Sequence, residues 1–192
     1  MLFHFLFLFA TLPNMNKTDT SDPIVLAEGK YFAFMKRGRW EYIQPTGFTG
    51  VVLIVPVTDD GKIVLIEQYR PPVNAKVIEI PAGLVGDEAH RANENQAHGA
   101  NRELHEETGY EAQHMELLTE GTPSAGSNSV RLSIYKATGL MKTGPGGGDH
   151  TEDITVHEVP MGEVRNWLQQ RAELGYVIDL KVYAGLYLAG IQ

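Results

Sequence analysis

The sequence predicts a mixed α/β sandwich of the α+β kind, folded as one domain over residues 24–192. β-rich runs fill the first part of the chain, one helical pattern lies in the middle, and further strands and two helices follow. Elements in this order pack as layers around a mixed central sheet. The 192 residues suffice for one full core, and a content of 43% hydrophobic and 21% charged residues is ordinary for a globular protein.

The first strands are expected to form an N-terminal antiparallel strand extension and a longer hairpin. Residues 31–35 and 40–43 are β-rich, and a turn at Arg37-Gly38 joins them. Residues 51–57 and 62–68 are longer β-branched runs separated by a turn that contains Asp-Gly. Such a turn between two such runs is a strong hairpin signal.

The middle of the chain changes from strand to helix. Residues 77–80 read as another strand, because Pro81 stops the run. Residues 83–93 are polar and punctuated by glycine, which predicts a loop. The period then becomes helical over 95–108, and Gly109 suits the position just after a helix.

The last third of the chain is expected to contain strands at 114–119, 129–137 and 153–159. Two helices follow, over residues 161–173 and 179–189. The second helix carries an apolar set that predicts a core-packing face. This set is Leu180, Val182, Tyr183, Leu186 and Leu188.

The first twelve residues, MLFHFLFLFATL, are almost entirely apolar. They are fewer than the roughly 20 residues that span a bilayer, and they lack the basic region and cleavage site of a signal peptide. We interpret residues 1–23 as an apolar leader and a frayed terminus, containing either a weak signal-like segment or a misassigned start, with Met15 the true one. The expected location is the cytoplasm, without a membrane partner.

Charge and composition exclude several functions. The net charge is −8, so the chain repels polyanions and nucleic acid is not an expected partner. The sequence contains no cysteine, which excludes disulfides and thiolate metal sites. An acidic protein can still act on a phosphorylated small molecule when bound cations reverse the local charge.

The most informative segment is the acidic helix. Glu103, Glu106 and Glu107 lie three and four positions apart, so their side chains converge on one face. Like charges at these spacings repel, and no lysine stands at the matching offsets. A generic cluster of this kind is more often a solvated acidic face. Divalent cations of the Mg²⁺ or Mn²⁺ type, which prefer carboxylate oxygens, provide the alternative explanation.

The spacing favours the metal interpretation because it resembles the signature of the Nudix hydrolases. In that signature a Gly and a Glu precede Arg-Glu-aliphatic-x-Glu-Glu-x-Gly-aliphatic. Eight of its nine positions are present here: Glu94, Arg102, Glu103, Leu104, Glu106, Glu107, Gly109 and Tyr110. The opening glycine is the exception, because its expected position is Glu88. Gly83 is the nearest equivalent, with five extra residues in a loop that tolerates insertion.

Other segments resemble one branch of these hydrolases, the ADP-ribose and nucleoside-diphosphate-sugar diphosphatases. They are Trp40-Glu41, Glu67 to Pro72 and Glu79 to Gly83. The resemblance covers residues 30–190 and implies a Nudix-type α/β/α sandwich. It also implies a homodimer in which N-terminal strands reach a partner.

The resemblance implies a role for each residue of the signature. Glu103 and Glu107 would bind metal, Glu106 would bind it directly or through water, and Glu94 would support the cluster. The backbone carbonyl of Ala82 would complete the site. Arg102 would orient a glutamate by a charge-assisted hydrogen bond. The implied metal set is therefore Ala82, Glu94, Glu103, Glu106 and Glu107, with Mg²⁺ or Mn²⁺ as cofactor.

Substrate contacts are implied outside the signature. Arg70 would hold the diphosphate, since its planar fork suits phosphate oxygens; otherwise it is a surface arginine beside Pro71-Pro72. Trp40 would stack on a nucleobase; the alternative is an ordinary core or interface aromatic residue. Glu79 belongs to the same substrate-binding set.

The general base is expected on the late loop. Glu152 is preferred because it stands just before a strand, as the corresponding loop glutamate does in this branch; Asp149, His150 and Asp153 remain alternatives. A plain acidic loop edge is the ordinary alternative. The glycines at 144–148 suggest a mobile loop, or simply a linker.

Together these features predict Mg²⁺-dependent hydrolysis of ADP-ribose or a related nucleoside-diphosphate sugar. The segment Thr122-Pro123-Ser124-Ala125-Gly126 has alanine where ADP-ribose enzymes carry a proline, so other nucleotide sugars stay open. The alternatives are a hydrolase for a triphosphate or dinucleotide, and a Nudix-fold nucleotide sensor without catalysis.

Overall fold

The computed structural model describes residues 21–87, 94–148 and 152–191. The apolar leader, Met15, Glu88, Asp149 and His150 therefore lie outside the described residues. None of the described helices is both long and apolar enough to cross a membrane.

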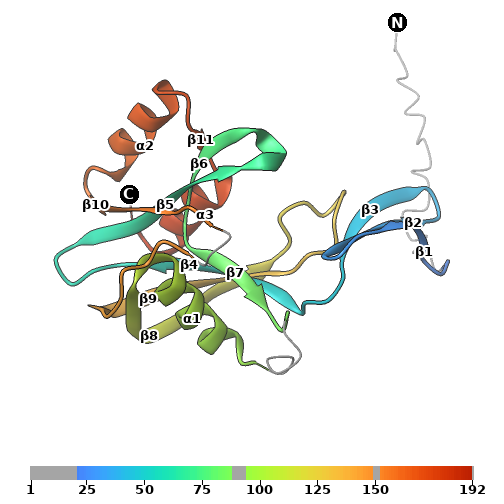
Figure 1. Ribbon diagram of the computed structural model, residues 1–192, viewed down its shortest axis with the longest axis horizontal. Helices are drawn as coiled ribbons and strands as arrows, with labels where there is room; N and C mark the ends of the chain where they lie inside the picture. Colours follow the sequence, from blue (N-terminus) through green and yellow to red (C-terminus); the bar gives the residue numbers. More distant parts are fainter. Residues whose placement is uncertain (1–20, 88–93, 149–151, 192) are drawn as a thin grey trace, which may run out of the picture.

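Eleven strands, one 3₁₀ turn and three α-helices make up the described fold (Figure 1). The first strands are β1 (Ile24–Glu28), β2 (Phe32–Arg37), β3 (Trp40–Pro45), β4 (Gly50–Pro56), β5 (Lys62–Arg70), β6 (Ala75–Glu79) and β7 (Ala82–Val85). The turn η1 (Pro71–Val73) joins β5 to β6. The later strands are β8 (Tyr110–Gly121), β9 (Leu132–Lys142), β10 (Thr155–Pro160) and β11 (Val177–Ile178). The helices are α1 (Gln96–Thr108), α2 (Val164–Glu173) and α3 (Leu180–Leu188).

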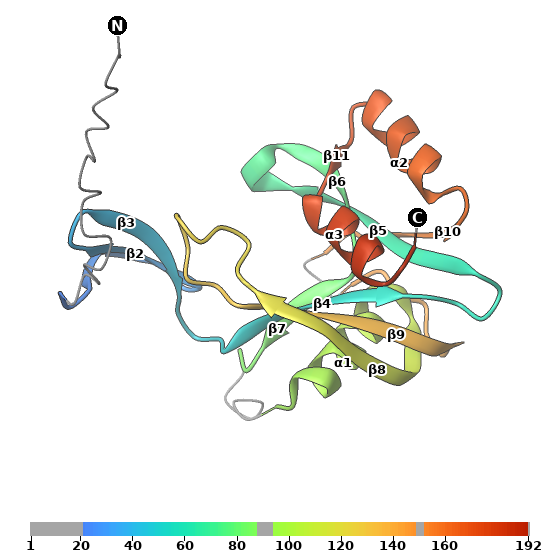
Figure 2. The same cartoon turned by 180° about the vertical axis from the view of Figure 1, so that it is seen from behind.

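The strands form three sheets. The order β1-β2-β3 is antiparallel and makes the N-terminal extension, which projects away from the rest of the chain in Figures 1 and 2. The orders β7-β4-β9-β8 and β10-β5-β6-β11 are both mixed, since β4 pairs parallel with β9 and β6 parallel with β11. The predicted α+β class with mixed sheets and an N-terminal extension is confirmed, with two mixed sheets in place of one central sheet.

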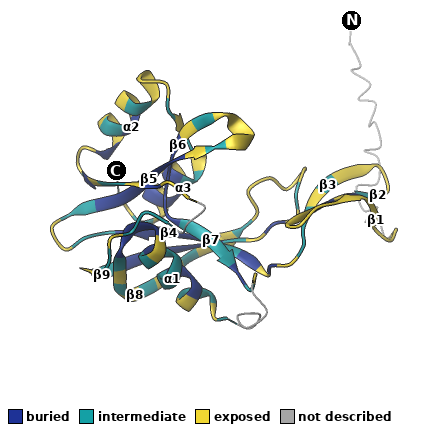
Figure 3. Cartoon of the chain, in the orientation of Figure 1, coloured by how far each residue is buried: buried dark blue, intermediate teal, exposed yellow. Residues whose placement is uncertain are grey.

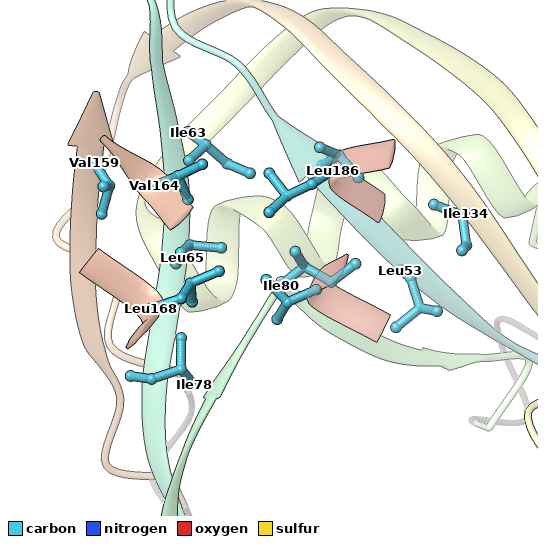
Figure 4. Close-up of a cluster of buried hydrophobic side chains, with 12 residues drawn as sticks. Leu53, Ile63, Leu65, Ile78, Ile80, Ile134, Val159, Val164, Leu168 and Leu186 are labelled. Atoms are coloured by element: carbon cyan, nitrogen blue, oxygen red, sulfur yellow. The ribbon is translucent and has the colours of Figure 1, made fainter. Parts of the chain in front are cut away.

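Strand β4 lies between β7 and β9 in its sheet, and both of its faces are buried (Figure 3). Val52 and Ile54 face α1, in a cluster with Leu104. Leu53 and Val55 face the opposite way and pack with residues of β5, α2 and α3 (Figure 4). The two alternating faces explain why this strand is a continuous hydrophobic run.

The layers follow from these two cores. Helix α1 packs on one face of the β7-β4-β9-β8 sheet, and α3 lies on the other (Figure 2). Helix α3 approaches closely because Gly185 has no side chain: a Cβ there would lie 2.9 Å from Val55 Cγ2. The result is the predicted α/β/α arrangement.

Several predicted bounds were wrong for physical reasons. Strand β7 lies where a loop was expected, because its glycine-containing segment gains its hydrogen bonds from β4. Strand β9 runs past Gly139, whose φ of 64° is tolerated within the ladder. Strands β1 and β11 were not predicted; β11 has only two residues and depends on β6.

The predicted core face of the last helix is only partly correct. Val182 and Leu186 are buried, whereas Leu180 is 78% exposed and Tyr183 and Leu188 are also exposed. Helix α3 contacts β4 along a narrow face that contains Gly185, and few large side chains fit between the helix and the strand on this face.

Candidate active site

Helix α1 presents the glutamates of the predicted signature. It begins after Asn95, whose side chain accepts a hydrogen bond from the backbone N–H of Ala97, and it ends at Gly109 with φ 75°. The predicted bounds of this helix are confirmed to within one residue. Leu104 is fully buried in the core and fixes the rotation of the helix. Glu103 and Glu107 consequently face β7.

Gly83 on β7 permits this contact. A Cβ at Gly83 would lie 1.9 Å from the carboxyl carbon of Glu103. With the Glu103 side chain in this conformation, only a glycine leaves space for its carboxylate against the strand. This requirement supplies a physical reason for a glycine at the place where the sequence suggested the displaced signature glycine.

Arg102 joins the acidic groups. Its Nη1 donates to Glu103 Oε1 at 2.8 Å and to Glu106 Oε2 at 2.9 Å. Its Nε donates to Glu94 Oε1 at 3.3 Å, and its Nη2 donates to Glu94 and to the carbonyl of Leu84. Each nitrogen of the guanidinium is therefore engaged by the acidic cluster or by the backbone of β7.

Burial makes the two inward-facing carboxyls weak acids. Burial raises the pKa of Glu103 to about 7, opposed by Arg102 and reinforced by Glu106. Glu107 is only 2% exposed, and burial raises its pKa well above the usual value, although it accepts a hydrogen bond from the Ala82 N–H at 3.0 Å. The carboxylate of Glu152 adds to this rise, which places Glu152 within electrostatic reach of Glu107.

The donor set fits a hard divalent cation. Carboxylate oxygens and a backbone carbonyl are the ligands that such ions prefer, and crowded acids of low exposure are stabilised by positive charge. Within the described ranges, no three carboxylate or imidazole groups converge as in a formed metal site. The Arg102 contacts explain this, because they turn Glu103 and Glu106 toward the guanidinium.

One cavity of about 640 Å³ brings together most of the predicted site residues. Those that line it are Arg70, Glu79, Ala82, Arg102, Glu103, Glu106 and Glu152. Arg70 Nε donates to Glu79 Oε2 at 2.8 Å, so these two form one ion pair at the cavity wall. Glu107 is buried beside the Ala82 N–H, and Glu94 lies against Arg102.

Trp40 is not brought into this cavity. It lies on β3 of the N-terminal sheet, is 52% exposed and does not line the pocket of its own chain. The guanidinium of Arg39 lies over its ring, 5.6 Å from the ring centroid.

The glycine-rich run contacts the end of α1. The N–H of Gly147 donates to Glu107 O at 2.8 Å, and that of Gly148 donates to Glu106 O at 3.0 Å. Gly146, Gly147 and Gly148 all have positive φ, which glycine adopts without strain. In the described part of the loop, these glycines cap the helix that carries the glutamates.

The cap also positions Glu152. A Cβ at Gly148 would lie 2.7 Å from Glu152 Cβ, so the glutamate packs directly on the glycine. Of the alternatives for the base, Asp153 is exposed and does not line the cavity.

The structure adds site residues that sequence reasoning missed. Lys181 of α3 lines the cavity, although its helix was interpreted only as a packing element. Phe32 and Phe48 also line it and contact each other edge to face, with ring centroids 5.8 Å apart. The sequence around Lys181 does not indicate a site residue. Lys181 reaches the cavity because the start of α3 is hydrogen-bonded to β6 through Asp179, and this is a contact between distant segments.

Comparison with known proteins agrees with this geometry. A methanol dehydrogenase activator of Bacillus methanolicus is 34% identical over 123 residues, 64% of this chain and 64% of its own. An ADP-ribose pyrophosphatase of Bacillus subtilis (strain 168) is 35% identical over 91 residues, 47% of this chain and 46% of its own. The chain thus spans less than two thirds of the length of either relative.

A solved structure described as an ADP compounds hydrolase shares the fold, with a TM-score of 0.64 and 22% identity over 88% of this chain and 89% of its own. Residues 47–174 match the NUDIX domain, and this stretch contains α1, its glycine cap, α2 and every strand of the two mixed sheets except β11. From the signature helix, the cavity that it lines and this match, the chain belongs to the NUDIX domain family.

Proposed function

We propose that this chain hydrolyses the diphosphate linkage of ADP-ribose or a related nucleoside-diphosphate sugar, with Mg²⁺ or Mn²⁺ as cofactor. The products are a nucleoside monophosphate and a sugar phosphate. One observation carries the proposal: a single cavity holds the acids Glu103 and Glu106 of α1 together with the Arg70–Glu79 pair of β5 and β6. The name of the Bacillus subtilis relative, an ADP-ribose pyrophosphatase, supports the substrate class.

The metal would be held by Glu103, Glu106, Glu107 and the carbonyl of Ala82, with Glu94 supporting the cluster through Arg102. When bound, it would neutralise the diphosphate and stabilise the charge that develops at phosphorus. Arg102 would hold Glu103 and Glu106 in place. Glu152 would take the proton of the attacking water as general base.

Substrate positioning is proposed for three residues. Arg70 has Nη1 and Nη2 left for phosphate oxygens, because only its Nε is engaged by Glu79. Glu79 sets the orientation of that fork. Trp40 would stack on the base from the N-terminal sheet, which requires a second copy of the chain because Trp40 lies outside its own cavity.

A homodimer is therefore part of the proposal. The N-terminal sheet exposes large apolar side chains on a projecting element, and such a surface is typical of a protein interface (Figure 3). They are Ile24, Val25, Leu26, Tyr31, Phe32, Phe34, Trp40 and Ile43. We further propose that residues 24–192 act as one domain and that the chain works in the cytoplasm, which the lack of cysteine fits.

The test is product analysis with Mg²⁺ or Mn²⁺ on a panel of ADP-ribose, ADP-glucose, GDP-mannose, UDP-glucose, a dinucleotide and a nucleoside triphosphate. We expect a nucleoside monophosphate and a sugar phosphate from at least one nucleotide sugar. Exclusive turnover of the triphosphate or the dinucleotide would replace the proposed substrate class. No turnover of any compound by metal-loaded protein would favour a nucleotide sensor and refute the hydrolase.

The base is tested separately. Glu152→Gln should lower kcat by about a hundredfold or more, a typical loss for a general base. The variant should bind substrate as the wild type does. An unchanged rate would move the role to Asp153, Asp149 or His150.

A further inference from the structure

Three cationic side chains line the cavity in the described part of the chain: Arg70, Arg102 and Lys181. Arg102 is engaged by three glutamates and by the Leu84 carbonyl. Its donors are therefore directed at the protein and not at a ligand. This leaves Arg70 and Lys181 as the cations with donors available to an anion in the cavity.

Lys181 is held in place by the start of α3. Its backbone N–H donates to Asp179 Oδ1 at 2.8 Å, and its Nζ pairs with the other oxygen of the same carboxylate. The N–H of Asp179 donates in turn to Ile78 O on β6 at 3.0 Å. The first turn of α3 is thereby fixed to the strand that carries Glu79.

Arg70 and Lys181 have the same kind of ion-pair arrangement. Each cation is paired with one carboxylate, Glu79 for Arg70 and Asp179 for Lys181, and each keeps further N–H donors. The two pairs are electrostatic neighbours. Burial raises the pKa of Glu79, Arg70 opposes that rise, Asp179 adds to it and Lys181 opposes it. A carboxylate that orients a cation lowers the entropy lost when the cation binds a ligand.

The acids that line the cavity are Glu79, Asp87, Glu103, Glu106 and Glu152. The cations with available donors come from β5 and α3. A diphosphate carries negative charge on both phosphoryl groups, and one arginine fork engages only part of that charge.

We infer that Lys181 is a second substrate-binding cation of this cavity, which holds the diphosphate beside Arg70. The inference rests on the proposed function and adds a residue to it. The ammonium group acts as a point charge that complements the planar fork of Arg70. Because its contact is with phosphoryl oxygens in the ground state, Lys181 contributes to substrate affinity more than to the chemical step.

The experiment compares Lys181→Met with Lys62→Met. The two lysines form a matched pair: each has a side chain that is 35% exposed and an ion pair to an aspartate two residues earlier, but Lys62 does not line the cavity. We expect Lys181→Met to raise the KM of the nucleotide sugar that the wild type turns over by about tenfold, or 1.4 kcal/mol, with kcat within about twofold. Lys62→Met should leave both unchanged, and Lys181→Arg should restore most of the affinity.

Equilibrium binding separates this inference from the proposed function. The probe is a methylene-bridged analogue of ADP-ribose, titrated into wild type and Lys181→Met with the melting temperature of each recorded. If the wild type hydrolyses nucleotide sugars and Lys181→Met has wild-type KM and affinity, the inference is wrong. If the wild type binds the analogue in a Lys181-dependent way but hydrolyses nothing, only the proposed hydrolysis fails.

Two further outcomes are decisive. No binding of the analogue to the wild type would overturn both proposals. The second is that Lys181→Arg binds the analogue as weakly as Lys181→Met does and also melts at a lower temperature than the wild type. That result would indicate a structural role for Lys181 and would also overturn the inference. Lys181→Gln, which keeps a polar side chain at the first turn of α3, replaces the methionine variant if that variant melts early.

Discussion

At the scale of single residues, the site is a set of acids that the fold has crowded together around one arginine. Glu94, Glu103 and Glu106 all contact Arg102, and Glu107 is buried beside the Ala82 N–H. A cation that binds Glu103 and Glu106 therefore competes with the Nη1 of Arg102 for the same oxygens. Arg102 neutralises these acids in the structure, and we propose that it also orients them when metal binds.

Glu107→Gln should lower kcat by about a hundredfold or more, in line with the loss of one preorganised charged group. The amide oxygen can still accept the Ala82 N–H, so we expect the fold to survive. Activity with saturating Mg²⁺ and far-UV circular dichroism measure the two effects. Near-normal activity would contradict a ligand role for Glu107.

The metal-free protein should become less stable as the pH rises from about 5 to about 8. Burial raises the pKa of Glu103 to about 7 and that of Glu107 well above its usual value, so the folded state binds more protons than the unfolded state. The stability of the protonated form is present below the unfolded pKa and is lost as the pH rises through the folded pKa.

Thermal unfolding in the presence of a chelator measures this dependence. The melting temperature should fall over that pH range, and Glu103→Gln should flatten the curve because the amide does not titrate. Excess Mg²⁺ should reduce the dependence as well, since it stabilises the ionised form. A chelated wild type that gains stability over the same range would refute the assignment.

At the scale of elements, the glycine-rich run and α1 form one unit. Gly147 and Gly148 donate to the carbonyls of Glu106 and Glu107, and Gly146 lies directly on the last turn of the helix. The same loop leads to Glu152, so the cap connects the proposed base to the proposed ligands.

Gly146→Ala should destabilise the protein by about 2 kcal/mol, because a non-glycine residue is strained at positive φ. The new Cβ would lie 2.4 Å from the carbonyl carbon of Thr108, and backbone atoms cannot move aside cheaply. Activity should fall with stability as Glu152 is displaced. Urea unfolding and kcat are the measurements.

Gly162→Ala is the matched control for this substitution. A Cβ at Gly162 meets nothing within 4 Å and its φ is not positive, so its stability should stay near that of the wild type. Equal effects of the two substitutions would show that the contact with α1 does not matter.

At the scale of the whole molecule, the N-terminal sheet is the feature that a single copy leaves unexplained. It projects from the domain in both views and exposes apolar side chains (Figures 1 and 2). Phe34 and Ile43 stand opposite each other in the β2–β3 register and are both exposed. Two such sheets packed together would bury this surface and bring Trp40 toward another cavity.

The double variant Phe34→Glu and Ile43→Glu should convert a dimer into a monomer, because charges in an interface core are strongly unfavourable. Sedimentation of the wild type should give twice the mass of the chain, and the variant should give a single mass with reduced affinity for substrate. Tyr187→Glu, which changes an 82% exposed residue of α3, should remain dimeric. A monomeric, fully active wild type would rule out the dimer.

The sequence alone determined the signature helix, its bounds and the residues that line one face of it. It could do so because helical spacing, the Asn95 cap and the Gly109 end are local, and because the spacing of the acids is a one-dimensional pattern. The class of fold followed for the same reason, since the order of strands and helices is written along the chain.

Only the tertiary structure decided which distant residues meet. Strand β7 exists because β4 pairs with it, and Gly83 matters because Glu103 lies over it. Lys181 enters the cavity because α3 is tied to β6, and the glycine-rich run caps α1. These outcomes depend on contacts between segments far apart in the chain, which no local periodicity encodes, so the sequence could name the acids, Arg70 and Arg102 but not Lys181, which shares their cavity.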